Sequence, residues 1–211
     1  MSFKGVGLLT APGRVMTPRA ASEQVATAAL TRLQSRPARV ADVGTGAGAL
    51  AIAIAVAAPR VDVWATDSSR SAVALACANV HRHGLEDRIH VCHGDLLAPV
   101  PGAIDLIVAN LPYLPRRTRR RYPDLRAEPD EAVFATGDGL DLYRRLLCSA
   151  EERLTSSGAV ILQLHRRVVL AERVQLAQVR ETLSELVPEG LRRAVEPPVP
   201  CDEVASLRRA A

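Results

Sequence analysis

Alternation of short β-branched runs with longer helical patterns is the feature that most constrains the fold of this chain. The expected strands cover residues 38–43, 61–66, 89–93, 104–110 and 158–164. Strands that alternate with helices form a parallel sheet through right-handed crossovers, and the helices then cover both faces of the sheet. We therefore predict an α/β fold with a predominantly parallel sheet.

Helical patterns lie before, between and after these strands. Residues 20–33 form an expected N-terminal helix, and residues 48–59 are apolar all round, as in a helix enclosed by its neighbours. Ser68 or Ser69 should cap the next helix, which Gly84 ends. After the amphipathic segment 140–154, we expect one more helix at about 170–186 and a closing pair of strands at 191–197 and 202–208.

Length and composition favour a single domain without a membrane span and without a metal site. A chain of 211 residues with 48% hydrophobic residues can bury one sizeable core. We expect a helical lead-in at 1–36, a core at 38–165 and a divergent C-terminal part at 166–211. No stretch is long enough to span a bilayer and no signal peptide is apparent, so we expect the cytoplasm. The four cysteines lack partners at metal-ligand spacing, so we expect no metal.

A glycine-rich turn after the first strand indicates a nucleotide-type ligand. It reads DVGTGAG and contains Asp42, Gly44, Thr45, Gly46 and Gly48. Glycines at a strand-to-helix turn let a ligand approach the main chain at a helix N-terminus. Asp67, followed by Ser68, ends the second strand about 20 residues on, where a carboxylate can accept ribose hydroxyls. This pairing suits NAD and S-adenosylmethionine equally well.

Two more polar signals follow the next two strands. Asp95 can accept a hydrogen bond from an exocyclic adenine amine, and Leu96 can form an apolar wall beside the ring. The fourth strand ends in the tetrad Asn110-Leu111-Pro112-Tyr113. Ligands of open α/β sheets bind at the carboxyl ends of the strands, so these residues should border one crevice. Each signal alone is compatible with a plain turn, but four successive strand ends favour a site.

These motifs together resemble the HemK/PrmC family of protein-(glutamine-N5) methyltransferases. The segments that carry the resemblance, within about residues 12–165, are GRVMTPRAASEQV, DVGTGAGALAIAIA, ATDSSRSAVALACANVHRHGL, GDLL, DLIVANLPYLP and EPDEAVFATGDGLDLYRRLL. The resemblance implies a Rossmann-like class I methyltransferase fold with a seven-stranded sheet and S-adenosylmethionine as cofactor. It also implies transfer of a methyl group to a glutamine amide in a protein such as a peptide chain release factor.

The chain departs from that family in three ways. The small helical N-terminal domain of the family is absent from the sequence, and Leu111 replaces the first proline of its Asn-Pro-Pro-Tyr tetrad. The acidic residue usual at the end of the fifth strand is replaced by Gln163-Leu164-His165. These departures leave the expected fold and cofactor unchanged but affect the choice of substrate.

The tetrad suits methyl transfer to a planar NH2 group, whose lone pair is delocalised. The Asn110 side-chain oxygen can accept one N–H and the Leu111 carbonyl the other, which orients the nitrogen and stabilises developing positive charge. Pro112 restricts the backbone before it, and Tyr113 offers a flat face to the acceptor. We expect catalysis by positioning in a dry site, without a general base of shifted pKa.

A basic loop directly after the tetrad leaves the acceptor open. It contains Arg116, Arg117, Arg119, Arg120 and Arg121. Such a run is often a solvated loop, but it can also attract an RNA backbone or an acidic protein face. We favour a protein acceptor. The alternatives are methylation of an adenine amine in RNA, a non-catalytic cofactor-binding subunit and, least favoured, an oxidoreductase.

Overall fold

A six-stranded sheet lies at the centre of the computed structural model, which describes residues 1–165 and 167–188. The strand order is β10-β9-β6-β3-β4-β5, and every pair is parallel except β10 with β9. The bounds are β3 (Ala38–Val43), β4 (Val61–Asp67), β5 (Ile89–His93), β6 (Ile104–Ala109), β9 (Leu154–Leu164) and β10 (Arg167–Glu172). The predicted α/β fold with a predominantly parallel sheet is confirmed.

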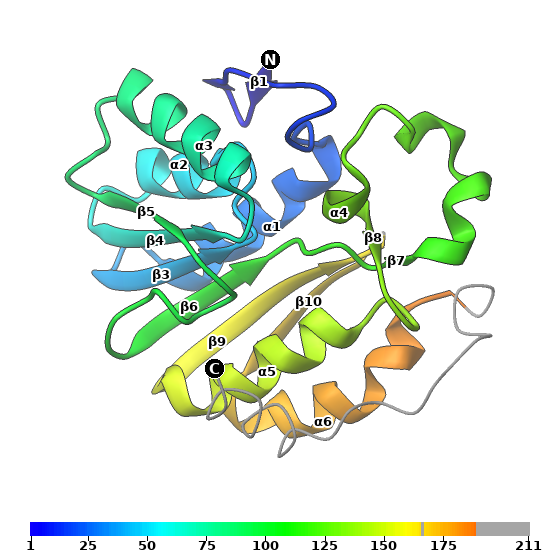
Figure 1. Cartoon of the computed structure of the whole chain (residues 1–211). Helices are drawn as coiled ribbons and strands as arrows, with labels where there is room; N and C mark the ends of the chain where they lie inside the picture. Colours follow the sequence, from blue (N-terminus) through cyan, green and yellow to red (C-terminus); the bar gives the residue numbers. More distant parts are fainter. Residues whose placement is uncertain (166, 189–211) are drawn as a thin grey trace.

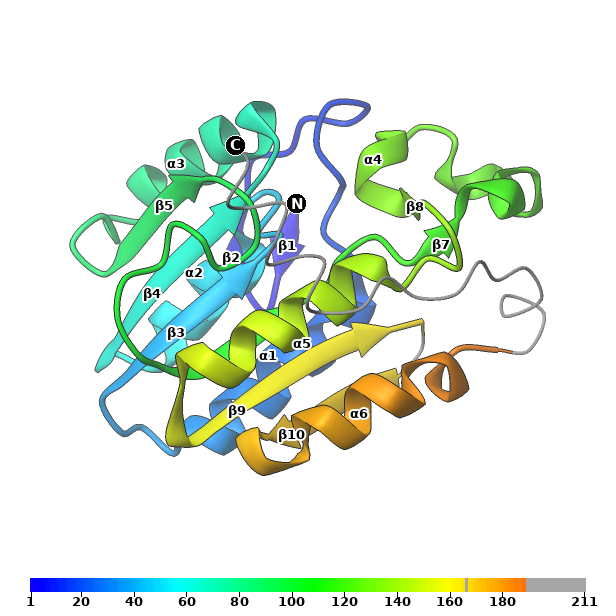
Figure 2. The same ribbon diagram turned by 60° about the horizontal axis from the view of Figure 1, so that its bottom comes forward.

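Helices cover both faces of this sheet, as Figures 1 and 2 show. One face carries α1 (Ala20–Leu33), α2 (Ala49–Ala57) and α3 (Arg70–Arg82), and the other carries α5 (Asp141–Arg153) and α6 (Leu176–Thr182). Successive residues of a strand point to opposite faces. Along β9, Ala159 and Ile161 accordingly pack in the core under α1 and α2, whereas Val160 and Leu162 pack under α5. Both faces of the sheet are therefore closed to water, as a parallel sheet requires.

The strand register brings the carboxyl ends of the central strands to one edge. Val43 of β3 is paired with Thr66 of β4 on one side and with Ala109 of β6 on the other, and Asp67 is paired with His93 of β5. The turns that follow these strands therefore start side by side. This is the edge where the predicted ligand site should lie.

Short elements surround that edge. The N-terminus forms a hairpin, and the segment between β6 and α5 folds beside the sheet as a lobe that pairs β7 with β8 (Figure 1). The bounds are β1 (Ser2–Phe3), β2 (Val6–Gly7), β7 (Leu114–Pro115), η1 (Arg116–Arg121), η2 (Pro123–Leu125), α4 (Asp130–Val133), β8 (Phe134–Ala135), η3 (Arg173–Gln175) and η4 (Leu183–Leu186). None of the helices in the part of the chain that the structure describes is long and apolar enough to cross a membrane.

The C-terminal part corrects the sequence prediction. The helix expected at 170–186 is wrong at its start, because residues 167–172 form β10, antiparallel to β9. His165 has a positive φ of 57°, which allows the tight reversal after β9, and Val168 and Val169 favour the extended strand that follows. Five of the seven expected strands are seen in the described residues, β10 is an unexpected sixth strand of the sheet, and the pair expected at 191–197 and 202–208 lies outside the described residues. The predicted domain boundaries stay a prediction.

Candidate active site

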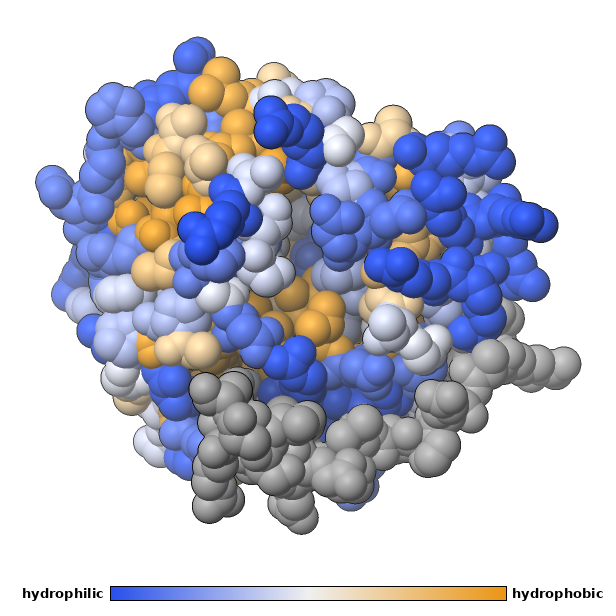
Figure 3. Space-filling model, viewed as in Figure 1, coloured by the Kyte–Doolittle hydropathy of each residue, from blue (hydrophilic) through white to orange (hydrophobic). Residues whose placement is uncertain are grey.

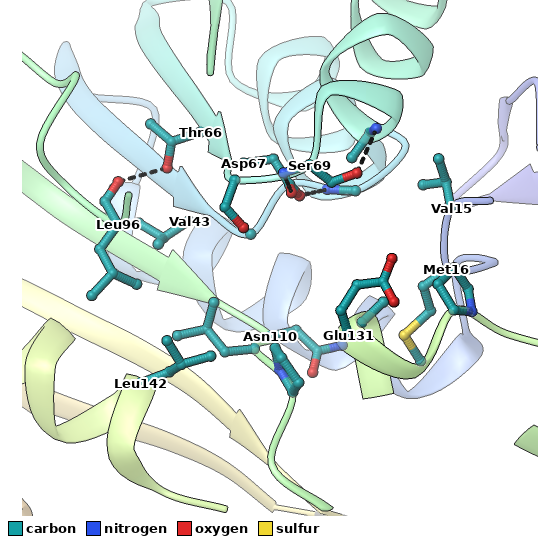
Figure 4. A pocket seen from close by; sticks show the side chains of 18 of the residues that line it. Val15, Met16, Val43, Thr66, Asp67, Ser69, Leu96, Asn110, Glu131 and Leu142 are labelled. Carbon is teal, nitrogen blue, oxygen red and sulfur yellow. Dashed lines mark hydrogen bonds between the residues drawn. The ribbon is translucent and has the colours of Figure 1, made fainter. Parts of the chain in front are cut away.

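A cleft of about 850 Å³, partly open to solvent, lies at the carboxyl edge of the sheet. Figure 3 shows the molecule hollowed near the centre of this face, and Figure 4 shows the side chains that line the cleft. Nine residues predicted from the sequence line it: Gly44, Gly46, Asp67, Ser68, Asp95, Leu96, Asn110, Leu111 and Pro112.

The glycine-rich turn forms the floor of the cleft. Gly44, Gly46 and Gly48 have φ values of 74°, 58° and 81°, a region that only glycine adopts without strain. A side chain on Gly44 would also lie 2.7 Å from Leu111 Cδ2, so the glycine lets the leucine of the tetrad pack on the turn. Gly48 is the N-cap residue of α2 and does not line the cleft.

Asp42 holds the turn from beneath instead of facing the cleft. Its Oδ2 accepts hydrogen bonds from Thr45 Oγ1 at 2.7 Å and from the Ala51 amide at 3.1 Å, and its Oδ1 is buried without a partner among the described residues. Burial raises the pKa of Asp42 to about 6, although these two hydrogen bonds oppose the shift. Thr45 lines a smaller neighbouring cavity. The sequence led us to expect Asp42 and Thr45 at the ligand site, but neither residue borders the main cleft.

Asp67 reaches into the cleft from the end of β4 (Figure 4). Its Oδ2 accepts from the Gly46 amide at 2.9 Å and its Oδ1 from the Ser69 amide at 2.9 Å, which fixes the carboxylate against the turn. Each carboxylate oxygen has more than one acceptor site, so both can also accept from a ligand. Burial raises the pKa of Asp67 despite the hydrogen bonds from Ser69 and Gly46.

Asp95 and Leu96 border the cleft after β5. Leu96 has a positive φ of 45°, and its carbonyl accepts a hydrogen bond from the buried Thr66 hydroxyl at 2.8 Å. This bond holds the apolar side chain at the wall of the cleft. Asp95 forms an ion pair with Arg145 of α5, a contact that the sequence did not suggest.

The tetrad is held from both faces of the sheet. Asn110 Nδ2 lies 2.8 Å from the Ser22 hydroxyl of α1, to which it donates. From the other face, the buried Tyr143 hydroxyl of α5 accepts from the Leu111 amide at 2.9 Å and lies 2.6 Å from the Gln163 carbonyl and 3.0 Å from the Leu111 carbonyl. The carbonyl expected to accept a substrate N–H thus already faces a hydroxyl group.

A second cavity, of about 680 Å³, lies on the other side of the tetrad. It shares Asn110, Leu111 and Pro112 with the first cleft, so the tetrad forms the boundary between the two. Other lining residues come from the segment before α1 and its first turn, from the lobe and from the end of β9: Met16, Arg19, Ala21, Tyr113, Leu114, Tyr122, Leu125, Ala132, Val133, Gln163 and His165. The fourth residue of the tetrad, Tyr113, borders the second cavity but not the first cleft.

Two segments far apart in the sequence, the N-terminal segment and the lobe, meet around these cavities. Glu128 accepts a hydrogen bond from the Thr17 amide at 3.0 Å and pairs with Arg19, which joins the lobe to the N-terminal segment. Gly139 has a φ of 94°, and a side chain there would lie 2.2 Å from the Tyr113 carbonyl oxygen. Only glycine can therefore let the loop before α5 pass so close to the tetrad.

Sequence reasoning missed several lining residues. Met16, Glu131 and Leu142 border the main cleft, and the Glu131 side chain points into it in Figure 4. Ser22 and Gln163 were not predicted as site residues either. Their sequence signals are weak. Met16, Ser22, Glu131 and Leu142 lie in segments that resemble the family as a whole, and Gln163 lies where the sequence departs from the family pattern.

The basic loop is mostly engaged by the protein itself. It forms η1, where Arg119 pairs with Asp130 at 2.8 Å and Arg117 donates to the Gly137 carbonyl at 3.2 Å. The side of the molecule that carries η1 and η2 is strongly hydrophilic in Figure 3. In the described part of the chain, no group of three His, Cys, Asp or Glu side chains could hold a metal ion.

Comparison with known proteins identifies the relatives of this chain. Residues 21–121 match the family model of the methyltransferase small domain. A release factor glutamine methyltransferase of Deinococcus radiodurans is 41% identical over 162 residues, which cover 75% of this chain and 57% of the relative. A ribosomal protein uL3 glutamine methyltransferase of Bradyrhizobium diazoefficiens is 42% identical over 130 residues, 61% of this chain and 41% of the relative. The chain thus spans about half the length of these curated relatives.

Solved structures support the fold. A ribosomal protein L11 methylase of Lactobacillus delbrueckii subsp. bulgaricus matches with a TM-score of 0.54 and 27% identity, over 82% of this chain and 71% of that one. A Thermus thermophilus 16S rRNA N2 G1207 methyltransferase in complex with AdoMet and guanosine matches with a TM-score of 0.55 and 20% identity, over 74% and 37%. The methyltransferase family model and the glutamine methyltransferase relatives favour S-adenosylmethionine over NAD as the cofactor. The chain is therefore a homologue of the HemK/PrmC release factor glutamine methyltransferases, and its described part has the Rossmann-like class I methyltransferase fold.

Proposed function

We propose that this chain transfers a methyl group from S-adenosylmethionine to the side-chain amide of a glutamine in a protein. The observation that carries the proposal is the position of Asn110 between the two cavities, with its Nδ2 tied to Ser22. This bond leaves Oδ1, the acceptor of the amide group, for an N–H of the substrate. The relatives that are named as glutamine methyltransferases support the same reaction.

The residues of the cleft fit the cofactor. Asp67 offers acceptors for two ribose hydroxyls, Leu96 and Leu142 offer apolar walls for the adenine ring, and Asp95 offers an acceptor for its amine. The main chain at Gly44 and Gly46 is open to the methionine part, and Glu131 presents a negative charge for its ammonium group. When bound, S-adenosylmethionine supplies a methyl group attached to a positively charged sulfur.

The tetrad would orient the acceptor nitrogen and stabilise its charge. Nitrogen forms a bond to the methyl carbon as the bond from that carbon to sulfur breaks, and the nitrogen then releases one proton to water. Asn110 Oδ1 accepts an N–H throughout, so it interacts more strongly as positive charge develops. Tyr113 packs beside the acceptor in the second cavity, where burial raises the pKa of its hydroxyl and keeps it neutral.

The substrates named for the relatives suggest which protein to test first. They are a release factor and the ribosomal protein uL3, and both names support a protein acceptor in the cytoplasm. Because the chain spans about half of each relative, the choice between them stays open to experiment. We take a release factor as the first acceptor because the first relatives carry that name.

The test is transfer from labelled S-adenosylmethionine to a purified release factor, with the modified residue mapped by mass spectrometry. We expect label on a glutamine amide that survives nuclease treatment. Asn110→Ala should bind the cofactor almost as well as the wild type but transfer methyl on the order of 100-fold more slowly, as for loss of one preorganised polar group. Gln178→Ala, which removes an exposed amide from α6, is the matched control and should behave as wild type. Unchanged turnover of Asn110→Ala would show that the tetrad is only a turn.

RNA is the second candidate acceptor, and exposed arginines beside the acceptor cavity favour it. Arg116 and Arg120 are exposed on η1, and Tyr122, next in the chain, lines the second cavity. If RNA binds here, Arg116→Gln with Arg120→Gln should reduce the slope of log affinity against log salt by about 0.7 per lost phosphate contact. Label recovered as methyladenine would show that RNA, and not a protein glutamine, is the methyl acceptor. Cofactor binding without transfer to either acceptor would favour the non-catalytic subunit.

A further inference from the structure

The Gln163 side chain lies beside Asn110 on the same face of the sheet. The register of β6 with β9 pairs Ala109 with Leu162, so Gln163 of β9 lies next to Asn110, the residue that follows β6. Ile161, two residues earlier, packs in the core under α1, and alternation along the strand turns Gln163 the same way. Asn110 likewise reaches α1 through Ser22. Two carboxamides therefore face the second cavity from adjacent strands.

Gln163 is buried and its side-chain oxygen is unpaired. Only 5% of the residue is exposed, and Oε1 has no hydrogen-bond partner in the described structure. A buried polar atom without a partner costs free energy comparable to a lost hydrogen bond, so folds rarely retain one without a role. The main chain of Gln163 is held firmly, because its carbonyl accepts from the Tyr143 hydroxyl at 2.6 Å. The main chain of Gln163 is thus fixed in place, and the residue lines the second cavity with its Oε1 buried at the cavity wall.

The chemistry of a carboxamide matches that of the proposed substrate. A glutamine side chain carries one carbonyl acceptor and two N–H donors, and a second carboxamide can pair with it through two reciprocal hydrogen bonds. The substrate N–H that lies on the same side as its carbonyl would donate to Gln163 Oε1, and its carbonyl would accept from Gln163 Nε2. The remaining N–H then points to Asn110 Oδ1.

We propose that Gln163 is a specificity-determining residue that recognises the methyl-acceptor carboxamide through this reciprocal pair. The inference rests on the proposed function and deepens it. It explains how the site can bind an amide although the Leu111 carbonyl already faces Tyr143. It also selects against a carboxylate, since a glutamate side chain has no N–H to donate and would leave Oε1 buried and unpaired.

The experiment compares Gln163→Met with the wild type and with Gln178→Met, the same change on the exposed surface of α6. Methionine has nearly the length of glutamine but cannot pair with an amide. The probes are the release factor with its mapped glutamine and the same protein with that glutamine replaced by glutamate. We measure methyl transfer, binding of both probes, cofactor affinity by calorimetry and stability to urea.

For Gln163→Met we expect kcat/KM to fall on the order of 10- to 100-fold, mainly through KM, as for loss of a hydrogen-bonded specificity contact. The wild type should bind the glutamine probe more tightly than the glutamate probe, and the variant should lose this preference. Cofactor affinity should not change, because Gln163 does not line the cofactor cleft. Stability should hold or rise, because an unpaired buried amide is removed.

Three results would overturn the inference, and they can be told apart. Wild-type kcat/KM and an unchanged preference in Gln163→Met would reject the role of Gln163 while the proposed function stands. Loss of stability in parallel with activity would show that Gln163 only supports the fold. Absence of glutamine methylation by the wild-type protein would reject the proposed function together with the inference.

Discussion

Replacing Tyr143 by phenylalanine tests how the tetrad is held. The hydroxyl is fully buried between the Leu111 amide at 2.9 Å and the Gln163 carbonyl at 2.6 Å. It has one proton, so we take it to donate to the nearer carbonyl and to accept from the Leu111 amide. Burial raises the pKa of Tyr143 well above its usual range, so the hydroxyl keeps its proton in ordinary buffers. Phenylalanine keeps the ring and removes only these bonds.

The expected loss follows from the two main-chain groups left unpaired. Each costs roughly 1–3 kcal/mol when buried without a partner, so the free energy of unfolding should fall by roughly 2–6 kcal/mol. This is a large part of the roughly 5–15 kcal/mol that keeps a typical domain folded. Turnover at saturating cofactor should also fall, because Leu111 lies within the tetrad whose geometry orients the acceptor.

Urea unfolding followed by circular dichroism measures the first effect, and methyl transfer to the release factor measures the second. For the urea measurement Tyr122→Phe is the matched control, because that tyrosine is half-buried in the lobe and donates no hydrogen bond in the described part of the chain. A Tyr143→Phe protein with a loss below about 0.5 kcal/mol, the usual range for neutral surface changes, would refute the reasoning.

Three further predictions concern the cleft and its support. Asp67→Asn should weaken S-adenosylmethionine binding at least about tenfold, since hydrogen bonds to a charged group contribute roughly 1.5–3 kcal/mol; calorimetry with unchanged affinity would contradict this. Ser22→Ala should lower turnover several-fold with cofactor affinity retained, and Ser22→Thr should restore it; equal turnover in all three proteins would show that Asn110 needs no support from α1. Asp42 has a folded-state pKa of about 6, above the ordinary value of 3.8, so its contribution to stability is fully present below pH 3.8 and is lost as pH rises through about 6. Asp42→Asn should therefore flatten urea stability between pH 4 and 7 and gain up to roughly 3 kcal/mol at pH 7, and an unchanged pH slope would contradict the raised pKa.

The order of strands and helices and the position of the cleft could be predicted from the sequence because their signals are local. The apolar period distinguishes strand from helix, and turn residues such as Gly48 and Gly84 lie where helices begin and end. Parallel strands bring their carboxyl ends to one edge, so Asp67, Asp95 and Asn110 could be assigned to one crevice before the structure was known.

Only the tertiary structure decided how the site is supported and what faces the acceptor. Ser22 and Asn110 are separated by 88 residues, and Tyr143 and Leu111 by 32, so no local pattern relates the members of either pair. The same holds for Gln163, which in the sequence was only a departure from a family pattern at the end of β9. Its proximity to Asn110 depends on the register of β6 with β9, and its unpaired amide depends on which atoms the packing of α1, β9 and the lobe leaves within reach. Side-chain partners across strands and helices are set by this packing, which the period of a single segment does not encode.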